Sequence, residues 1–210
     1  MTPASRPHRA EAAALLRAAW PVIVGQLGMM TLNTVDTVMV GRYGGEALAA
    51  VTLANTWSFA WLIVGIGGGS GLDPALAQAW GARDDAGYDR AVVRGLALLL
   101  ALSVPIALSQ LFTAPALLLA GQPPELVPLA RSYALALAPS TPAILAWFLL
   151  KQALQGRSRG RLVMWTTVFG NVVNVAANVL LMEGIGSWPG LGPTGSGVAT
   201  SVVRYAMLAV

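Results

Sequence analysis

Long stretches without any charged side chain dominate this sequence and limit what it can fold into. Asp, Glu, Lys and Arg are all absent from residues 47–72, 95–124, 132–150, 162–182 and 184–203. A helix of about 20 mostly apolar residues is long enough to cross the ~30 Å hydrocarbon core of a bilayer. Open strands cannot satisfy their backbone N–H and C=O groups in lipid, so these runs are predicted to be transmembrane helices.

A further span is predicted near the N-terminus, and it differs from the others because it contains an acid. Arg17 and Arg42 enclose 24 residues, of which only Asp36 carries a formal charge. Together the runs make six candidate spans, the sixth interrupted at Val210. Charged residues form 10% of the chain, against about 25% in soluble domains. The predicted fold class is therefore an all-α polytopic membrane protein, with a lobe of six transmembrane helices at 15–210.

Basic residues follow the predicted loops asymmetrically. The N-terminal segment and the loops after the second and fourth spans hold Arg6, Arg9, Arg17, Arg83, Arg90, Arg94, Lys151, Arg157, Arg159 and Arg161. The opposite connections hold only Arg42 and Arg131. Because basic loops remain in the cytoplasm, we expect a cytoplasmic N-terminal tail at 1–14, cytoplasmic loops at 81–94 and 155–161, and insertion in the cytoplasmic membrane. The net charge of +4 then reflects topology, not a nucleic-acid site.

Proline and glycine indicate where the helices bend or end. The first helix is expected at 15–41 and contains Pro21, which removes a backbone donor and favours a bend. The second, at 46–80, has a glycine-rich middle at 65–71 that allows close helix packing or a local break. The other helices are expected at 92–120, 128–155, 162–182 and from 195 onward.

Asp36 is the strongest functional signal in the sequence. An acid at the centre of a span costs at least about 2.5 kcal/mol on insertion scales, so it normally faces protein or a water-filled cavity. In the fifth predicted helix, Asn171, Asn174 and Asn178 lie at i, i+3 and i+7 and share one face. Their amide oxygens could bind a cation, or their amides could bond a carboxylate. Interhelical hydrogen bonding without an ion is the structural alternative.

Other polar residues of the spans are candidates for lining a cavity. Gln26 and Asn33 lie on roughly the same face of the first helix as Asp36, which favours a functional site. In the sixth helix, Thr200 and Arg204 are one turn apart. Thr200 can bond its own i−4 carbonyl instead of an ion. Arg204 can snorkel toward the membrane surface or pair with an acid, and the sequence leaves both open.

A catalytic function is disfavoured because the only histidine lies outside the predicted spans, away from any candidate nucleophile. The segment GGSG at 68–71 places Ser70 in a glycine-rich setting typical of some intramembrane serine proteases. Such a nucleophile requires a general base within hydrogen-bond reach. The only histidine, His8, precedes the first span. We therefore predict that the chain is not an enzyme and needs no cofactor.

Several motifs together resemble the multidrug and toxic compound extrusion (MATE) transporters. They are VDTVMVG at 35–41, GLDP at 71–74, AQAWGA at 77–82, QALQG at 152–156 and GSGVAT at 195–200. Each is weak alone, but their order along the chain is specific. The resemblance implies half of a two-lobed, pseudo-twofold transporter that moves cationic organic substrates across the membrane between its lobes. This chain is similar to the N-terminal lobe, whose partner is a C-terminal lobe.

The same resemblance implies particular roles for residues of this chain. It places a cation site at Asp36, Asn174, Asn178 and Thr200, and it makes Pro21 the residue at which the first helix bends. Some members have an aspartate where this chain has Asn178, so a single carboxylate remains here and Na⁺ or H⁺ coupling stays open. The implied function is antiport of drugs by alternating access.

Two other functions remain open from the sequence. A lipid-linked precursor flippase of the same superfamily would share the two-lobed architecture, but it should have a more cationic cavity for pyrophosphate, and the charge in the first helix is negative. A truncated membrane fragment that does not transport is the other alternative.

Overall fold

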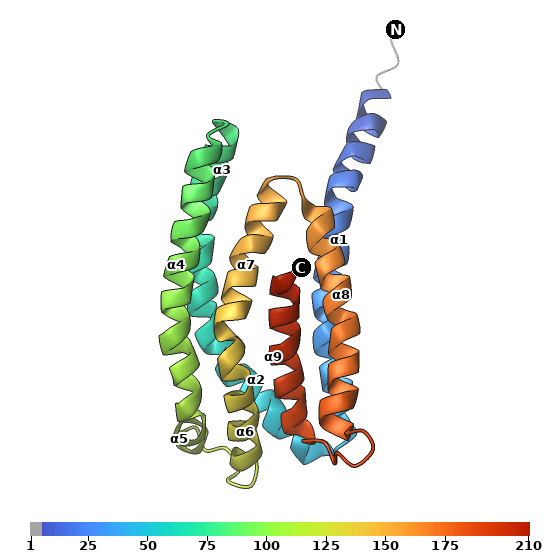
Figure 1. Ribbon diagram of the computed structural model, residues 1–210, viewed down its shortest axis with the longest axis vertical. Coiled ribbons are helices and arrows are strands. Elements are labelled where there is room, and N and C mark those ends of the chain that lie inside the picture. Colours follow the sequence, from blue (N-terminus) through green and yellow to red (C-terminus); the bar gives the residue numbers. More distant parts are fainter. Residues whose placement is uncertain (1–5) are drawn as a thin grey trace.

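The computed structural model describes residues 6–210, and this part of the chain contains helices and no strand. The long helices run side by side and alternate in direction (Figure 1). In chain order the elements are α1 Arg6–Gly41, α2 Gly45–Ser70, α3 Asp73–Gly81, α4 Asp85–Ser109, η1 Gln110–Phe112, α5 Thr113–Leu119, α6 Val127–Leu137, η2 Ala138–Ser140, α7 Thr141–Gly156, α8 Gly160–Asn178, η3 Val179–Glu183 and α9 Pro193–Ala209. The prediction of an all-α membrane protein is confirmed.

The structure divides several of the predicted spans into shorter helical segments. The glycine-rich segment of the second span remains helical to Ser70, and the break follows at Gly71 and Leu72. Gly65 and Gly69 in this segment lie against side chains of α4 and α7. The fourth span is divided into α6 and α7 by the 3₁₀ turn η2, since Pro139 lies in that turn. The fifth span ends in the π-helical segment η3.

Helical stretches that are long and apolar enough to cross a membrane are Gly45–Gly81, Asp85–Leu119, Val127–Gly156 and Gly160–Glu183 among the described residues. The predicted first and sixth spans are helices as well, but α1 contains the polar residues described above, and α9 has 17 residues. Helix α1 begins at Arg6, well before the expected start at 15. Residues 1–5 of the expected tail lie outside the described residues.

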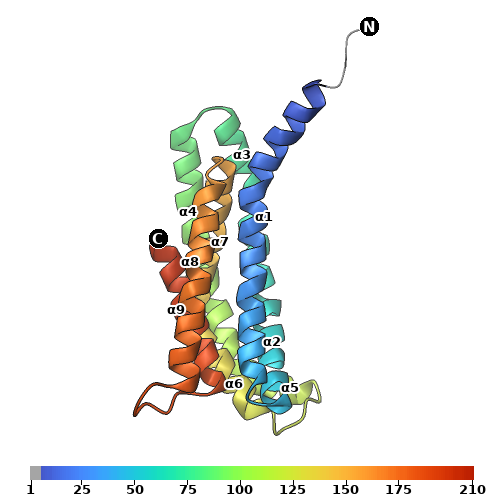
Figure 2. The same cartoon turned by 90° about the vertical axis from the view of Figure 1, so that its right-hand side faces the viewer.

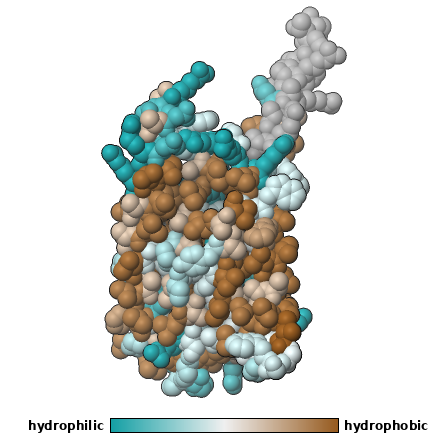
Figure 3. Space-filling model, viewed as in Figure 1, coloured by the Kyte–Doolittle hydropathy of each residue, from teal (hydrophilic) through white to brown (hydrophobic). Residues whose placement is uncertain are grey.

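The surface fits a protein that is embedded in lipid. In Figure 3 hydrophobic residues cover much of the side of the bundle, and hydrophilic residues gather at the end that holds the loop between α3 and α4. Large apolar side chains that face outward include Val93, Val104, Phe112 and Trp165, all more than half exposed. Because no soluble domain exposes so much apolar surface, this belt is the face that contacts the acyl chains.

Close helix packing brings three helices together at the functional site. Helix α1 lies along α8, and α8 lies along α9. A Cβ atom added at Gly28 of α1 would be 2.7 Å from Thr167 Cγ2 of α8, and one added at Gly170 of α8 would be 2.7 Å from Met207 Sδ of α9. Small residues at these contacts let the backbones approach closely, which sets the positions of polar side chains on all three helices.

Candidate functional site

The Asp36 carboxylate is held by hydrogen-bond donors from two other helices. Its Oδ1 accepts from Asn174 Nδ2 at 2.9 Å and from Asn178 Nδ2 at 2.6 Å, both on α8. Its Oδ2 accepts from Thr200 Oγ1 of α9 at 3.2 Å. The structure therefore brings together the four residues that the sequence and the resemblance place in a cation site.

Helical spacing explains why these donors converge on one acid. Asn174 and Asn178 are separated by one turn of α8, so both side chains point toward α1, and both are fully buried. The Thr200 hydroxyl also lies 2.9 Å from the carbonyl of Ser196, its i−4 residue. Because a hydroxyl has one proton, Thr200 shares it between the backbone carbonyl and Asp36 Oδ2, and the backbone contact is the shorter of the two.

Buried oxygen atoms beside the carboxylate have no hydrogen-bond donor. Asn174 Oδ1 and Asn178 Oδ1 are buried and unpartnered among the described residues. Half a turn of a carboxamide about its terminal torsion exchanges its NH₂ group for its oxygen. The site therefore offers two kinds of stabilisation: amide donors for a bare carboxylate, or amide oxygens for a cation bound to that carboxylate. Carboxylate, amide and hydroxyl oxygens are ligands for hard cations.

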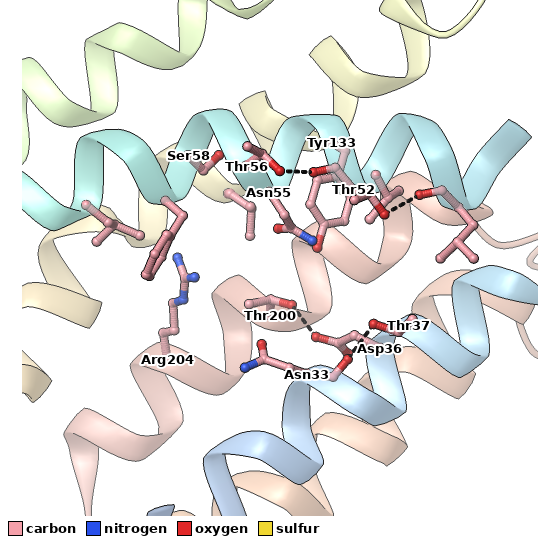
Figure 4. A pocket seen from close by; sticks show the side chains of 15 residues that line it. Asn33, Asp36, Thr37, Thr52, Asn55, Thr56, Ser58, Tyr133, Thr200 and Arg204 are labelled. Carbon is pink, nitrogen blue, oxygen red and sulfur yellow. Dashed lines mark hydrogen bonds between the residues drawn. The ribbon is translucent and has the colours of Figure 1, made fainter.

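A cavity of about 460 Å³ opens beside the acid. Figure 4 shows Asp36 and Asn33 of α1 on one side of it, Thr200 and Arg204 of α9 next to them, and polar residues of α2 opposite. The cavity is lined by Asn33, Asp36, Thr37, Leu48, Val51, Thr52, Asn55, Thr56, Ser58, Phe59, Leu62, Tyr133, Leu137, Thr200 and Arg204. Its volume falls in the range of small-molecule sites, about 300–1,000 Å³.

Two of the proposed cavity residues lie elsewhere. Gln26 is exposed and is not part of the cavity wall. Asn171 Nδ2 donates to the carbonyls of Gly28 and Thr167, each at 2.9 Å, so this residue joins α8 to α1 about one turn before Asn174. Spacing along the sequence assigns a residue to a helix face but does not say which neighbour it contacts. Asn171 contacts the backbone of α1, whereas the side chain of Gln26 is exposed.

The polar wall on α2 was not identified from the sequence. It contains Thr52, Asn55 and Thr56, at i, i+3 and i+4 of an otherwise apolar helix. The hydroxyls of Thr52 and Thr56 donate to backbone carbonyls one turn earlier in the helix, those of Leu48 and Thr52, at 2.7 and 2.9 Å. That spacing is the same signal that identified the asparagine face of α8, and it could have identified this wall.

Arg204 lines the cavity one turn beyond Thr200. Its Nη1 donates to Ser140 Oγ of η2 at 2.9 Å. Among the side chains that the structure describes, no acid forms an ion pair with it. The cavity thus carries one negative and one positive residue, and Arg204, a candidate cavity residue from the sequence, lies in its wall.

Pro21, the predicted bend residue, lies inside α1 and is buried. In Figure 2 the N-terminal part of α1 is tilted away from the rest of the helix. Gly160, the first residue of α8, is close enough that a Cβ atom there would be 3.5 Å from Pro21 Cβ. The absence of a proline N–H leaves a carbonyl in the preceding turn without its helical donor.

Helices that span a membrane, with a half-buried acid on the wall of a polar cavity, form the arrangement found in secondary transporters. The MatE family model matches residues 21–180 of this chain. The chain therefore belongs to the multidrug and toxic compound extrusion (MATE) family of transporters. Membership of this family confirms the resemblance inferred from the motifs and the prediction that the chain is not an enzyme.

Curated relatives and solved structures agree with this assignment. The probable multidrug resistance protein NorM of Bradyrhizobium diazoefficiens is 34% identical over 90% of this chain and 41% of its own length. The protein of the same name from Pseudomonas putida is 36% identical over 94% of this chain and 43% of its own. The outward-facing structure of a multidrug resistance MATE family transporter matches with a TM-score of 0.80 and 27% identity, over 93% of this chain and 43% of the other. The chain thus spans about two fifths of the length of these proteins.

Proposed function

We propose that this chain is the N-terminal lobe of a cation-coupled antiporter that exports organic cations and drugs by alternating access. The observation that carries the proposal is the Asp36 carboxylate, bonded by Asn174, Asn178 and Thr200 at the edge of a drug-sized cavity. The names of the curated relatives support drug export. The chain's similarity to about two fifths of those relatives supports its assignment to one lobe.

Competition for one carboxylate provides the coupling. A desolvated acid needs a partner to remain charged, and a cationic substrate, a Na⁺ ion or a proton can each serve. When the ion or proton occupies Asp36, the substrate loses its counter-charge and its affinity falls. Neutralisation also removes the charge to which the two asparagines donate. The packing of α1 against α8 then changes, and α1 moves by bending at Pro21.

Substrate passage requires a second lobe, because transporters of this architecture bind substrate near the interface of two repeats. We propose that the C-terminal lobe closes the open side of the cavity. A lipid-linked precursor flippase remains the second candidate, because Arg204 adds the positive charge that a pyrophosphate would require.

Ion-driven uptake into liposomes tests the antiporter proposal. The protein as its gene encodes it should take up a fluorescent organic cation when an outward gradient of either Na⁺ or H⁺ is imposed, and uptake should stop when an ionophore collapses that gradient. The ion whose gradient drives uptake identifies the coupling ion. Transport that is indifferent to both gradients would exclude coupled antiport.

Membrane orientation can be tested with single cysteines, because the chain contains none of its own. Ser158 and Ser187 are both exposed and lie at opposite ends of α8. From the positive-inside rule we expect Ser158→Cys to be shielded from a membrane-impermeant thiol reagent in intact cells, and Ser187→Cys to be labelled. Equal labelling of the two variants before and after permeabilisation would show that the proposed orientation is wrong.

A further inference from the structure

A second cleft lies at the basic end of the bundle, between α1 and the loop that joins α7 to α8. Its volume is about 440 Å³, and its wall includes Pro21 and Val22 of α1 together with Ser158, Arg159 and Arg161. In Figure 2 the N-terminal part of α1 tilts away from the bundle at the end where α8 begins. The cleft shares no lining residue with the cavity of the proposed cation site, so it is a separate place in the fold.

The charge of this cleft is positive. Arg159 and Arg161 line it, and its described wall contains no acid. Arg157, in the same loop, pairs with Asp89 at 2.8 Å and stacks on the ring of Tyr88, with 4.3 Å between the guanidinium carbon and the ring centroid. Arg159 and Arg161 form no such ion pair in the described part of the chain. Two guanidinium groups are therefore available to an anion in the cleft.

The loop holds these arginines in a defined position. Arg159 N donates to Leu154 O at 2.8 Å, which folds the loop back onto the end of α7. Helix α8 then begins at Gly160. A Cβ atom at Gly160 would lie 3.5 Å from Pro21 Cβ, so glycine keeps α8 close to α1 and leaves the cleft free of a side chain at this point.

Tryptophans flank the cleft on both helices. Trp20 precedes Pro21 on α1, and Trp165 lies one turn beyond Arg161 on α8, and both are more than half exposed. Tryptophan is enriched where the hydrocarbon core meets the headgroup layer of a membrane. The cleft therefore opens at the depth of lipid headgroups, and Leu162 adds apolar surface to its wall.

We propose that this cleft binds the headgroup of an anionic phospholipid, with the lipid phosphate held by Arg159 and Arg161. Basic pockets between transmembrane helices on the cytoplasmic side bind such headgroups, and a guanidinium offers paired donors to phosphate oxygens. A zwitterionic lipid binds more weakly, because its ammonium group offsets the charge of its phosphate. The bound headgroup joins α8 to α1 beside the bend at Pro21. The leaflet follows from the proposed orientation, but binding goes beyond the proposed function and requires neither a substrate nor an ion gradient.

Native mass spectrometry of the purified protein, in the form its gene encodes, counts the lipids that it retains. The protein in a non-ionic detergent is titrated with dioleoyl phosphatidylglycerol or with dioleoyl phosphatidylcholine. Wild-type protein should bind the first phosphatidylglycerol about tenfold more tightly than the first phosphatidylcholine. Arg159→Gln combined with Arg161→Gln should weaken binding of that phosphatidylglycerol by about tenfold or more and leave phosphatidylcholine within about twofold.

Control variants separate the cleft from a diffuse attraction between the basic loops and the lipid. Arg83→Gln combined with Arg94→Gln removes the same charge from two exposed arginines that do not line the cleft, so binding should stay within about twofold of wild type. Lysine at both 159 and 161 keeps the charge and should bind phosphatidylglycerol more tightly than the glutamine variant. Without lipid every variant should unfold at the wild-type temperature, which shows that the fold is intact. Phosphatidylglycerol should raise this temperature for wild type and not for the glutamine variant of the cleft, because a ligand of the folded state stabilises it.

The possible results discriminate among the sources of the anion. If wild-type protein retains both lipids equally, or if the cleft and control substitutions weaken phosphatidylglycerol binding equally, the proposal is wrong. Soluble glycerol 3-phosphate should not displace the lipid; displacement at equal concentration would make the cleft a site for a soluble phosphate and overturn the lipid assignment. If lipid binding depends on Arg159 and Arg161 but no ion gradient drives uptake, the antiporter proposal fails while the lipid site stands.

Discussion

Asp36→Asn should abolish ion-driven uptake and leave the fold intact. Asparagine keeps the shape of the side chain and one acceptor oxygen, so contacts with Asn174, Asn178 and Thr200 remain possible. It removes the charge for which ion and substrate compete, and it holds neither a proton nor a strongly bound cation at neutral pH. Loss of an acid within a span also removes an insertion cost of about 2.5 kcal/mol, so the amount of protein in the membrane should not fall.

The measurement is initial uptake of an organic cation into proteoliposomes, normalised to the protein in each preparation. Asp85→Asn is the matched control, because the same substitution then falls on the first residue of α4, whose side chain is 80% exposed and lies 3.8 Å from Arg157. It should transport at the wild-type rate. If Asp36→Asn transported at the wild-type rate, Asp36 would have a structural role only and the coupling site would lie elsewhere.

The central part of the site could be predicted from the sequence because helical geometry fixes it. An acid within an uncharged run must face the protein interior, and a repeat of three and four residues places Asn174 and Asn178 on one face. The family motifs then assigned Asp36, these asparagines and Thr200 to one site, and the structure brings all four together. The positions of the helices were likewise evident from charge-free runs.

Other features depend on how each helix is rotated and where it breaks, and a one-dimensional pattern does not contain that information. Asn171 belongs to the same face as Asn174 by spacing, yet it bonds the backbone of Gly28 because α1 and α8 touch there. Arg204 could have snorkelled or paired with an acid, and only the packing of α9 shows that it does neither. The break at Gly71 and Leu72 was one of two outcomes that a glycine-rich segment allows.

The junction between η3 and α9 determines the positions of Asn178 and Thr200. Segment η3 begins directly after Asn178, and α9 begins at Pro193. Leu191 N donates to Leu181 O at 2.8 Å, and Gly192 N donates to Met182 O at 3.2 Å, so the loop folds back onto η3. Gly195, buried at the start of α9, lies directly against the backbone of Leu181 and Met182. Any displacement here would separate the donors that Asp36 requires.

Gly195→Ala should therefore destabilise the protein and abolish transport. A Cβ atom at this position would overlap the carbonyl oxygen of Leu181 and lie 2.6 Å from its carbonyl carbon and 2.9 Å from Met182 N. These are backbone atoms that cannot rotate away, so relief requires η3 and α9 to move apart. Overpacking of this kind costs about 1–3 kcal/mol or more, which should lower the thermal midpoint in detergent by about 5 °C or more.

Gly67→Ala is the matched control, because it is the same substitution in a helix where no atom lies within 4 Å of the added Cβ. Alanine is favoured over glycine inside a helix by about 0.5–1 kcal/mol, so this variant should be as stable as wild type and should transport normally. Tryptophan fluorescence during heating reports the midpoint, and uptake into liposomes reports the site. If Gly195→Ala matched Gly67→Ala in both measurements, the contact between η3 and α9 would not be what holds Asn178 and Thr200 on Asp36.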